Sequence, residues 1–268
     1  MTFFILIAGP AGSGKSTITK ALSEWMGNNE LDAVKVNFDP AAEVMPYVPD
    51  VDVRRYVDYK EIMVKHNLAP NGALTASVDY LINYVAELRD EIDEFGSNYA
   101  LIDLPGQLEI VAFRRLGPKI LKELTRGVRA VMLFVVDARL AADPPSALSS
   151  ALLALSTLYR VELPLVLAVN KVDLIMKEGS DLEKALSSIY LLKMMSDEYS
   201  CVEAGSKTLF METDISENLC NVLREALGHE IVPVSAKEFV GLDEMYAALQ
   251  RVLYGGEDFL TEEYSSRI

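Results

Sequence analysis

FFILIAGPAGSGKST, residues 3–17, decides the fold of this chain. Its six apolar residues predict a buried strand, and the glycine-rich turn after them has the pattern G-x-x-x-x-G-K-S that leads into a helix. Such a turn curls its backbone N–H groups around phosphates, and the start of the helix adds the positive end of its dipole. We therefore expect a phosphate site that consists of Gly12, Ser13, Gly14, Lys15, Ser16 and Thr17.

Outward from this stretch, five further apolar runs alternate with helical patterns. The runs cover residues 33–38, 99–102, 130–136, 163–169 and 231–234. None has a period of two, as is typical of strands that are covered on both faces. One apolar stripe from Leu74 to Ile92 predicts a helix, and Pro144–Pro145 fit the first turn of another. This alternation predicts an α/β P-loop NTPase fold, with three α/β/α layers, a mainly parallel sheet and extra helical insertions.

The chain organisation follows from the lengths between these runs. Residues 1–254 are expected to form a single domain with insertions at 40–73 and 174–230, the second of which predicts extra helices and a solvated acidic surface. Residues 255–268 are acidic and are expected to form a mobile tail. No internal repeat or low-complexity linker interrupts the chain.

Composition excludes several classes of function. The 268 residues include 40 acidic and 25 basic side chains, a net charge of −15, which argues against sequence-independent binding of nucleic acid. No apolar run approaches the roughly 18 residues that a membrane span needs, and no basic region precedes residue 3. Cys201 and Cys220 are too few for a disulfide framework, so we expect buried thiols in a reducing compartment. A soluble, cytoplasmic protein is predicted.

A magnesium ion is expected beside the phosphate loop. Lys15 would reach the β- and γ-phosphates, and the Ser16 hydroxyl would coordinate Mg²⁺. Asp103 follows the apolar run at 99–102, where a carboxylate can hold the ion directly or through water. Gly106 would let a backbone N–H approach the γ-phosphate. Ser16 and Asp103 are the predicted metal ligands; the alternative for Asp103 is a helix cap.

The sequence N-K-V-D, residues 170–173, points to a guanine base. The Asp173 carboxylate can accept from the N1–H and the 2-amino group of guanine, whereas adenine lacks both donors. Lys171 can lie along the base plane, and Asn170 can tie this loop to the phosphate loop. The backbone N–H groups of Ser235, Ala236 and Lys237 could donate to guanine O6. GTP and GDP are therefore the predicted ligands, with a capped surface turn as the alternative.

The phosphate loop, D-L-P-G, N-K-V-D and S-A-K follow one another along the chain, as in GTPases. The chain resembles the GPN-loop GTPases over nearly its whole length, and in particular the archaeal type. Three further segments carry the resemblance: N-F-D-P-A at 37–41 with the stretch to Arg54, D-L-P-G-Q at 103–107, and A-P-N at 69–71. The family has a Gly-Pro-Asn loop at the last segment, and Ala69 replaces its first glycine here. Before Pro70 an extended backbone is favoured, which Ala69 tolerates, so we expect the loop to be kept. If the family conformation needs a positive φ at this position, Ala69 would be strained by roughly 1–2 kcal/mol.

The resemblance implies a homodimer in which each Pro-Asn loop reaches the nucleotide of the partner. Asn71 would then contact the γ-phosphate region in trans; the alternative is an ordinary turn before a helix. Hydrolysis needs an oriented water, for which Gln107, Asp39 and Glu109 are the candidates. Asp39 could equally belong to the surroundings of Mg²⁺, and Glu109 could favour a helix N-terminus instead. Arg54 and Arg55 could pair with carboxylates across the dimer or near phosphate, or remain surface charges.

The function predicted from the sequence is Mg²⁺-dependent binding and hydrolysis of GTP by a dimeric switch or assembly factor. A P-loop kinase is one alternative, although a kinase has no need of N-K-x-D. A scaffold that binds GTP without hydrolysing it is the other. A protein partner is expected at the acidic region 174–230 or at the tail, and no binding of nucleic acid or membrane.

Overall fold

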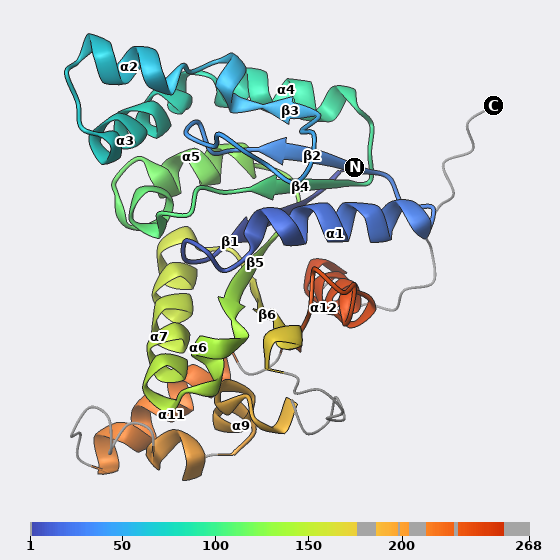
Figure 1. Ribbon diagram of the computed structural model, residues 1–268, viewed down its shortest axis with the longest axis vertical. Helices are drawn as coiled ribbons and strands as arrows, with labels where there is room; N and C mark the ends of the chain where they lie inside the picture. Colours follow the sequence, from blue (N-terminus) through green and yellow to red (C-terminus); the bar gives the residue numbers. More distant parts are fainter. Residues whose placement is uncertain (1, 176–185, 198, 204–212, 228–229, 255–268) are drawn as a thin grey trace.

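The computed structural model describes residues 2–175, 186–197, 199–203, 213–227 and 230–254. Its centre is a seven-stranded sheet in the order β3-β2-β4-β1-β5-β6-β7, in which every pair of neighbouring strands is parallel (Figure 1). The strands are β1 (Phe3–Ala8), β2 (Ala33–Asn37), β3 (Val51–Asp52), β4 (Tyr99–Asp103), β5 (Ala130–Asp137), β6 (Leu165–Asn170) and β7 (Ile231–Pro233). The six predicted strands are confirmed to within two residues at each end.

Helices cover both faces of the sheet, as the sequence predicted. α1 (Lys15–Asn28) and α12 (Leu242–Tyr254) lie on one face, and the other helices lie on the opposite face and at the sheet ends (Figure 1). These are α2 (Tyr59–Lys65), α3 (Pro70–Tyr80), α4 (Val85–Glu94), α5 (Gly117–Leu124), α6 (Ala138–Ala142), α7 (Pro144–Val161), α9 (Tyr190–Ser196) and α11 (Thr213–Leu227). Short helical turns occupy η1 (Val53–Arg55), η2 (Leu81–Asn83), the π-helix η3 (Glu109–Phe113) and η4 (Val172–Leu174).

The apolar residues of each strand divide between two hydrophobic cores. In β1, Ile5 and Ile7 pack with α1 and α12, whereas Phe4 and Leu6 pack in the core of the opposite face. Successive side chains of a strand point to opposite faces, so a strand buried on both needs an unbroken apolar run. This is why the apolar runs of the sequence, which lack a period of two, form the central strands.

Two parts of the secondary structure differ from the sequence prediction. The stripe from Leu74 to Ile92 is not one helix, because η2 interrupts it between α3 and α4. There the Asn83 side chain donates to the carbonyl of Tyr80 at 3.3 Å, which competes with the regular helical hydrogen bonds. The strand β3 was not predicted, because its two residues are too short for a recognisable apolar run.

The insertion at 174–230 does contain extra helices, α9 and α11, in the described part of the chain (Figure 1). Cys201 and Cys220 are both buried there, as predicted, but they form a disulfide, so the prediction of two free thiols was wrong. Their Cα atoms lie 5.8 Å apart, although 19 residues separate them in the chain. The packing of α11 brings them together, which no spacing rule could show. The tail, residues 255–268, lies outside the described residues.

Among the described residues, no helix has both the length and the apolar character that crossing a bilayer requires. The single-domain organisation of residues 1–254 stays a prediction.

Replacing Phe134 by Ala tests the core assignment. Phe134 is fully buried in the middle of β5, so its loss leaves a cavity and should lower the free energy of unfolding by about 3–5 kcal/mol. Phe95→Ala is the control, because Phe95 is 44% exposed and should contribute less than about 1 kcal/mol. Urea denaturation followed by circular dichroism measures both variants. Equal losses of stability would contradict this placement of the core.

Candidate functional site

The phosphate loop lies at the carboxyl end of β1, between the ends of β4 and β5. Two of its glycines are required by their surroundings. Gly9 has φ +141°, and a Cβ atom there would lie 2.3 Å from the carbonyl oxygen of Val135. Gly14 has φ +96°, and its Cβ would lie 2.4 Å from the Asn170 amide nitrogen. Side chains at either position would force the loop away from the neighbouring strands.

Lys15 is the buried cation of this loop. Its Nζ donates to the carbonyl oxygen of Pro10 at 3.2 Å, and its side chain lines a pocket of 310 Å³. Burial lowers the pKa of Lys15, while the charges of Asp103 and Asp39 oppose this shift. A buried ammonium group beside a pocket is stabilised by an incoming anion, which is what a phosphate site requires.

Three segments far apart in the sequence line this pocket. They are the phosphate loop, the stretch after β2 and the stretch after β4. The lining residues are Ala11, Gly12, Lys15, Ser16, Asn37, Asp39, Ala42, Val44, Met45, Asp103, Leu104, Gly106 and Gln107. The structure therefore brings both predicted metal ligands and two of the predicted catalytic residues to one place. Thr17 points to the surface at the first turn of α1 and is not among the residues that line the pocket.

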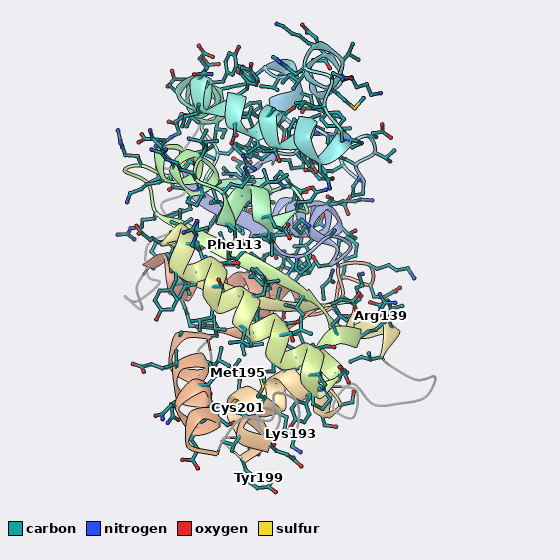
Figure 2. All side chains as sticks on the ribbon, turned by 90° about the vertical axis from the view of Figure 1, so that its left-hand side faces the viewer. Phe113, Arg139, Lys193, Met195, Tyr199 and Cys201 are labelled. Carbon is teal, nitrogen blue, oxygen red and sulfur yellow. A yellow bond between two sulfur atoms is a disulfide. The ribbon has the colours of Figure 1, made fainter. Side chains whose placement is uncertain are left out.

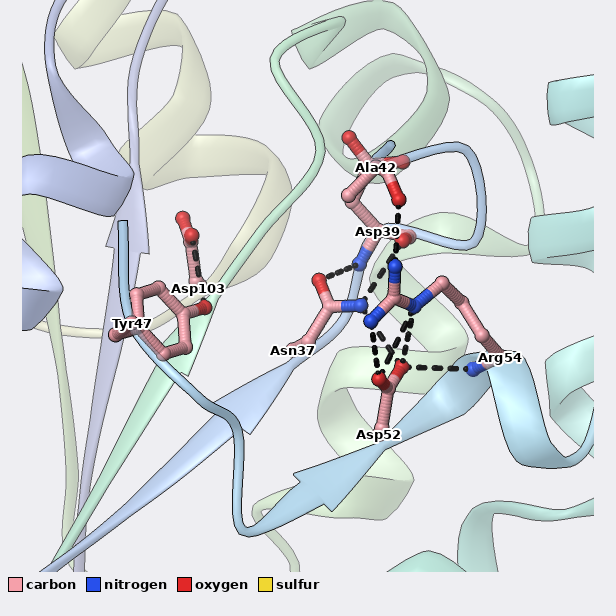
Figure 3. Close-up of polar contacts among 7 residues, drawn as sticks. All are labelled: Asn37, Asp39, Ala42, Tyr47, Asp52, Arg54 and Asp103. Carbon is pink, nitrogen blue, oxygen red and sulfur yellow. Dashed lines mark hydrogen bonds and ion pairs between the residues drawn. The ribbon is translucent and has the colours of Figure 1, made fainter. Parts of the chain in front are cut away.

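Asp103 has one occupied and one free carboxylate oxygen in the described part of the chain. The Tyr47 hydroxyl donates to Oδ2 at 3.0 Å (Figure 3), whereas the buried Oδ1 has no hydrogen-bond partner among the described residues. Burial raises the pKa of Asp103, and the nearby Ser16 and Tyr47 hydroxyls and Lys15 lower it. An orphaned buried carboxylate oxygen beside a serine hydroxyl offers the oxygen ligands that Mg²⁺ prefers, so Asp103 and Ser16 fit this ion.

A polar network holds Asp39 at the edge of the pocket (Figure 3). The Asn37 side chain accepts from the backbone N–H of Asp39 at 3.1 Å and donates to Asp52 at 2.9 Å. One Asp39 carboxylate oxygen accepts from the N–H of Ala41 at 2.9 Å. Burial raises the pKa of Asp39 above its ordinary value, although the Ala41 bond and the charges of Lys15 and Arg54 lower it. Such a carboxylate is a better proton acceptor than an exposed one.

Arg54 and Arg55 both find partners within the chain. Arg54 donates to both carboxylate oxygens of Asp52 at 2.6–3.0 Å and to the carbonyl of Ala42 at 2.8 Å (Figure 3). Arg55 pairs with Glu91 at 2.9 Å. Arg54 thus braces the segment that carries Asp39, a role that the sequence prediction did not include.

The segment after Asp103 places Gly106 and Gln107 at the pocket but Glu109 away from it. Gly106 lies against the phosphate loop, since a Cβ atom there would be 3.4 Å from Lys15 Nζ. Gln107 is exposed and lines the pocket. Glu109 is also exposed, but it begins η3 and is not among the residues that line the pocket. This supports its alternative role, a negative charge at a helix N-terminus, over a catalytic one.

The N-K-x-D loop is tied to the phosphate loop by Asn170. Its Nδ2 donates to the carbonyl of Ser13 at 3.0 Å, and its Oδ1 accepts from the backbone N–H of Ala236 at 3.1 Å. The Ser235 hydroxyl donates to Asp173 at 2.6 Å, and the Ser235 N–H donates to Val240. The N–H groups of Ser235 and Ala236 therefore donate to protein atoms, whereas the sequence predicted that they could donate to guanine O6. Their contribution is to hold Asn170 and Asp173 in place.

Asn71 lies in the first turn of α3 and is exposed. It does not line the pocket of its own chain. Ala69 before it has φ −67° and ψ 160°, an extended conformation that alanine adopts freely, and Pro70 occupies the first helical position. The strain considered for Ala69 is therefore absent.

Two polar residues near the site were missed in the sequence. Tyr47 binds Asp103, and Asp137 pairs with Lys171 at 2.8 Å. Asp137 ends an apolar run directly, as Asp103 does, and that shared position was a signal that could have found it. Tyr47 lies in an irregular segment with no pattern that marks it.

Comparisons with known proteins now bear on this geometry. Residues 7–255 match a protein family described as "conserved hypothetical ATP binding protein". GPN-loop GTPase 3 of Yarrowia lipolytica is 32% identical across 87% of this chain and 85% of its own length. GPN-loop GTPase QQT1 of Arabidopsis thaliana is 28% identical across 97% of this chain and 93% of its own. The chain spans 59% of GPN-loop GTPase 1 of Dictyostelium discoideum, at 29% identity.

A solved structure agrees with these relatives. A GTPase from Pyrococcus abyssi, crystallised in its apo form, superposes with a TM-score of 0.77 at 25% identity, and the match covers 94% of this chain and 97% of that one. The family match spans almost the whole chain and includes the phosphate loop, Asp103 and the N-K-x-D loop. The chain belongs to the GPN-loop GTPase family.

Proposed function

We propose that this protein binds and hydrolyses GTP with Mg²⁺ and works as a homodimeric, nucleotide-dependent switch or assembly factor. One observation carries the proposal. Lys15, Asp39 and Asp103 line one pocket, and the Asn170 side chain connects that phosphate loop directly to the N-K-x-D loop. A phosphate site and a base site therefore adjoin at one edge of the sheet, where ligands of open α/β sheets bind.

Guanine is favoured over adenine by Asp173. Its carboxylate accepts from the Ser235 hydroxyl through one oxygen, which orients the side chain at the end of β6. A guanine base would supply two further donors to it, whereas adenine would leave a desolvated carboxylate unpaired. The matching family is described as ATP binding, so the choice of base is the sharpest test of this part of the proposal.

For phosphate transfer to water, the chain supplies position and charge. Lys15 holds the phosphates, and Ser16 and Asp103 would hold Mg²⁺, which when bound neutralises charge on the β- and γ-phosphates. Gln107 lines the same pocket and can orient a water with its amide. Asp39, with its raised pKa, can accept a proton from that water late in the reaction.

The dimer completes the site in this proposal. Asn71 is exposed and stands apart from the pocket of its own chain, so it is free to contact the nucleotide of a second copy. A neutral amide there would donate to the oxygens of the γ-phosphate as charge develops on them. A cytoplasmic location and a protein partner at the acidic 174–230 region or the tail belong to the same proposal.

A GTP-binding scaffold without activity is the alternative of a different class. Against it, the pocket also contains Gln107 and the Asp39 carboxylate with its raised pKa, which can orient a water and accept its proton and which binding alone does not need. A P-loop kinase, the third candidate, would transfer the phosphate to an added acceptor, whereas we expect free inorganic phosphate as the product.

Asp173→Asn should change the base preference of the protein from guanine to xanthine. The amide loses an acceptor for the guanine donors but can donate to O2 of xanthine, so GTP affinity should fall at least about 100-fold while xanthosine triphosphate affinity rises. Titration calorimetry with GTP, ATP and xanthosine triphosphate measures the change. Unaltered GTP affinity would remove the base-site assignment.

Asp39→Asn should separate catalysis from metal binding. If Asp39 accepts the proton of the attacking water, kcat should fall about 100-fold or more, while the Mg²⁺ concentration for half-maximal GTP binding stays the same. Because the base must be deprotonated and its pKa is raised, the wild-type rate should fall with acidity at a higher pH than an ordinary Asp would give, and the variant should lose this acidic limb. A raised Mg²⁺ requirement with a retained limb would assign Asp39 to the metal instead.

Asn71→Ala should slow single-turnover hydrolysis at least tenfold, about 1.4 kcal/mol of barrier, and the wild-type rate should rise with protein concentration. Asn83→Ala is the matched control, because Asn83 is an exposed amide of η2 whose side chain donates to the carbonyl of Tyr80 in its own chain.

Mixing tests whether Asn71 acts in trans. Asn71→Ala keeps an intact phosphate loop, and Lys15→Ala keeps an intact Asn71, so a mixed dimer has one complete site. An equal mixture of these impaired variants should recover up to about a quarter of the wild-type rate, since half the dimers are mixed and each mixed dimer has one complete site of two. Absence of recovery despite mixed dimers would place Asn71 in its own chain's site or in none.

A further inference from the structure

Asp137 ends β5 next to the loop that is expected to bind the base. In the parallel pairing of β5 with β6 it lies beside Asn170, the first residue of N-K-x-D. Its side chain is only 8% exposed, so this carboxylate is nearly removed from water. A buried carboxylate needs cations and hydrogen bonds to offset its lost hydration. The groups that bind the Asp137 carboxylate therefore indicate its role.

Two cations share the carboxylate. Lys171 Nζ donates to Oδ2 at 2.8 Å, and Arg139 donates to Oδ1 at 3.0 Å and to Oδ2 at 2.6 Å. Oδ1 also accepts from the backbone N–H of Arg139 at 2.9 Å, which caps α6. Arg139 is 61% exposed at the molecular surface (Figure 2), whereas Lys171 is 25% exposed and lies over the phosphate loop. The buried half of the network is thus the half that faces the base loop.

Lys171 is held by its two ends. Its backbone has φ 68° and ψ 36°, a left-handed conformation that is unfavourable for a residue with a side chain. Its Nζ binds both Asp137 and the carbonyl of Gly12. Its Cε passes 3.6 Å from where a Cβ of Gly14 would be. The aliphatic stem is therefore stretched across the phosphate loop, where it would support the plane of a bound base.

We propose that Asp137 is a positioning residue for the nucleotide base: it anchors Lys171 across the phosphate loop and so sets the affinity and residence time of guanine nucleotides. The proposal rests on the base site argued above. The Gly12 carbonyl alone could let the ammonium turn towards solvent. The Asp137 carboxylate adds a charged partner beside the Gly12 carbonyl, so that the lysine stem keeps one direction before the nucleotide arrives.

Asp137→Asn is the test, because asparagine still caps α6 but loses the charge that holds Lys171. The dissociation rate of a fluorescent GDP analogue should rise about tenfold, as expected from the loss of one charge-assisted hydrogen bond, and the effect on hydrolysis should fall on KM more than on kcat. Arg139→Gln is the matched control. It removes the other cation of Asp137 without touching Lys171, and should change GDP dissociation less than about twofold.

A double-mutant cycle shows whether Asp137 acts through Lys171. Lys171→Met keeps an apolar stem and loses the ammonium, so it should release GDP faster by a similar factor, and adding Asp137→Asn to it should change little more. Fully additive effects would overturn the proposal, as would a wild-type GDP dissociation rate in folded Asp137→Asn. If that variant does not fold, Lys171→Met alone decides, since unchanged GDP release there also overturns it.

The failure of this inference differs from the failure of the base site itself. If Asp173→Asn shifts preference towards xanthosine triphosphate while Asp137→Asn releases GDP like the wild type, the guanine site stands and only the role of Asp137 falls. If neither variant changes nucleotide preference or GDP release, the base-site assignment and the role of Asp137 are both wrong.

Discussion

The hydrogen bonding of β1 on both sides is the constraint on which the rest of the structure depends. β1 pairs with β4 through Ile7 and Asp103, and with β5 through Ala8 and Phe134, all in parallel register. Parallel pairing puts the carboxyl ends of these strands at one edge, so the loops that follow them must meet there. The phosphate loop follows β1 and therefore lies between Asp103 and Asp137. Neither the pocket nor the base loop could form if this register slipped by one residue.

At that edge, buried charges balance one another. Burial lowers the pKa of Lys15 and raises those of Asp39 and Asp103, and each shift is opposed by the opposite charges nearby. Tyr47 occupies one oxygen of Asp103 and leaves the other without a partner among the described residues. Such a site is only partly satisfied without ligands, and an anion together with a cation would complete it. The same balance explains why Asp137 sits between two cations at the base loop.

Individual elements show how far the sequence could predict this structure. The central strands were found because burial on both faces demands unbroken apolar runs, and the phosphate and N-K-x-D loops because their chemistry needs fixed spacing. The sequence did not predict the two-residue β3 or the interruption of the helix at Asn83, since each depends on a few local contacts. The disulfide between Cys201 and Cys220 escaped because it depends on how α11 packs. Tyr47 escaped because irregular segments carry no periodic signal.

The sequence alone determined the fold class, the family, the phosphate loop and the place of the N-K-x-D loop. These features are local, because each depends on a short run of residues whose types and spacing are set by backbone geometry and hydrogen-bond chemistry. Only the tertiary structure decided which side chains stand beside them: Tyr47 on Asp103, Arg54 on Asp52, and Asp137 on Lys171. Contacts between distant segments follow from strand order and register, and no single segment contains that information.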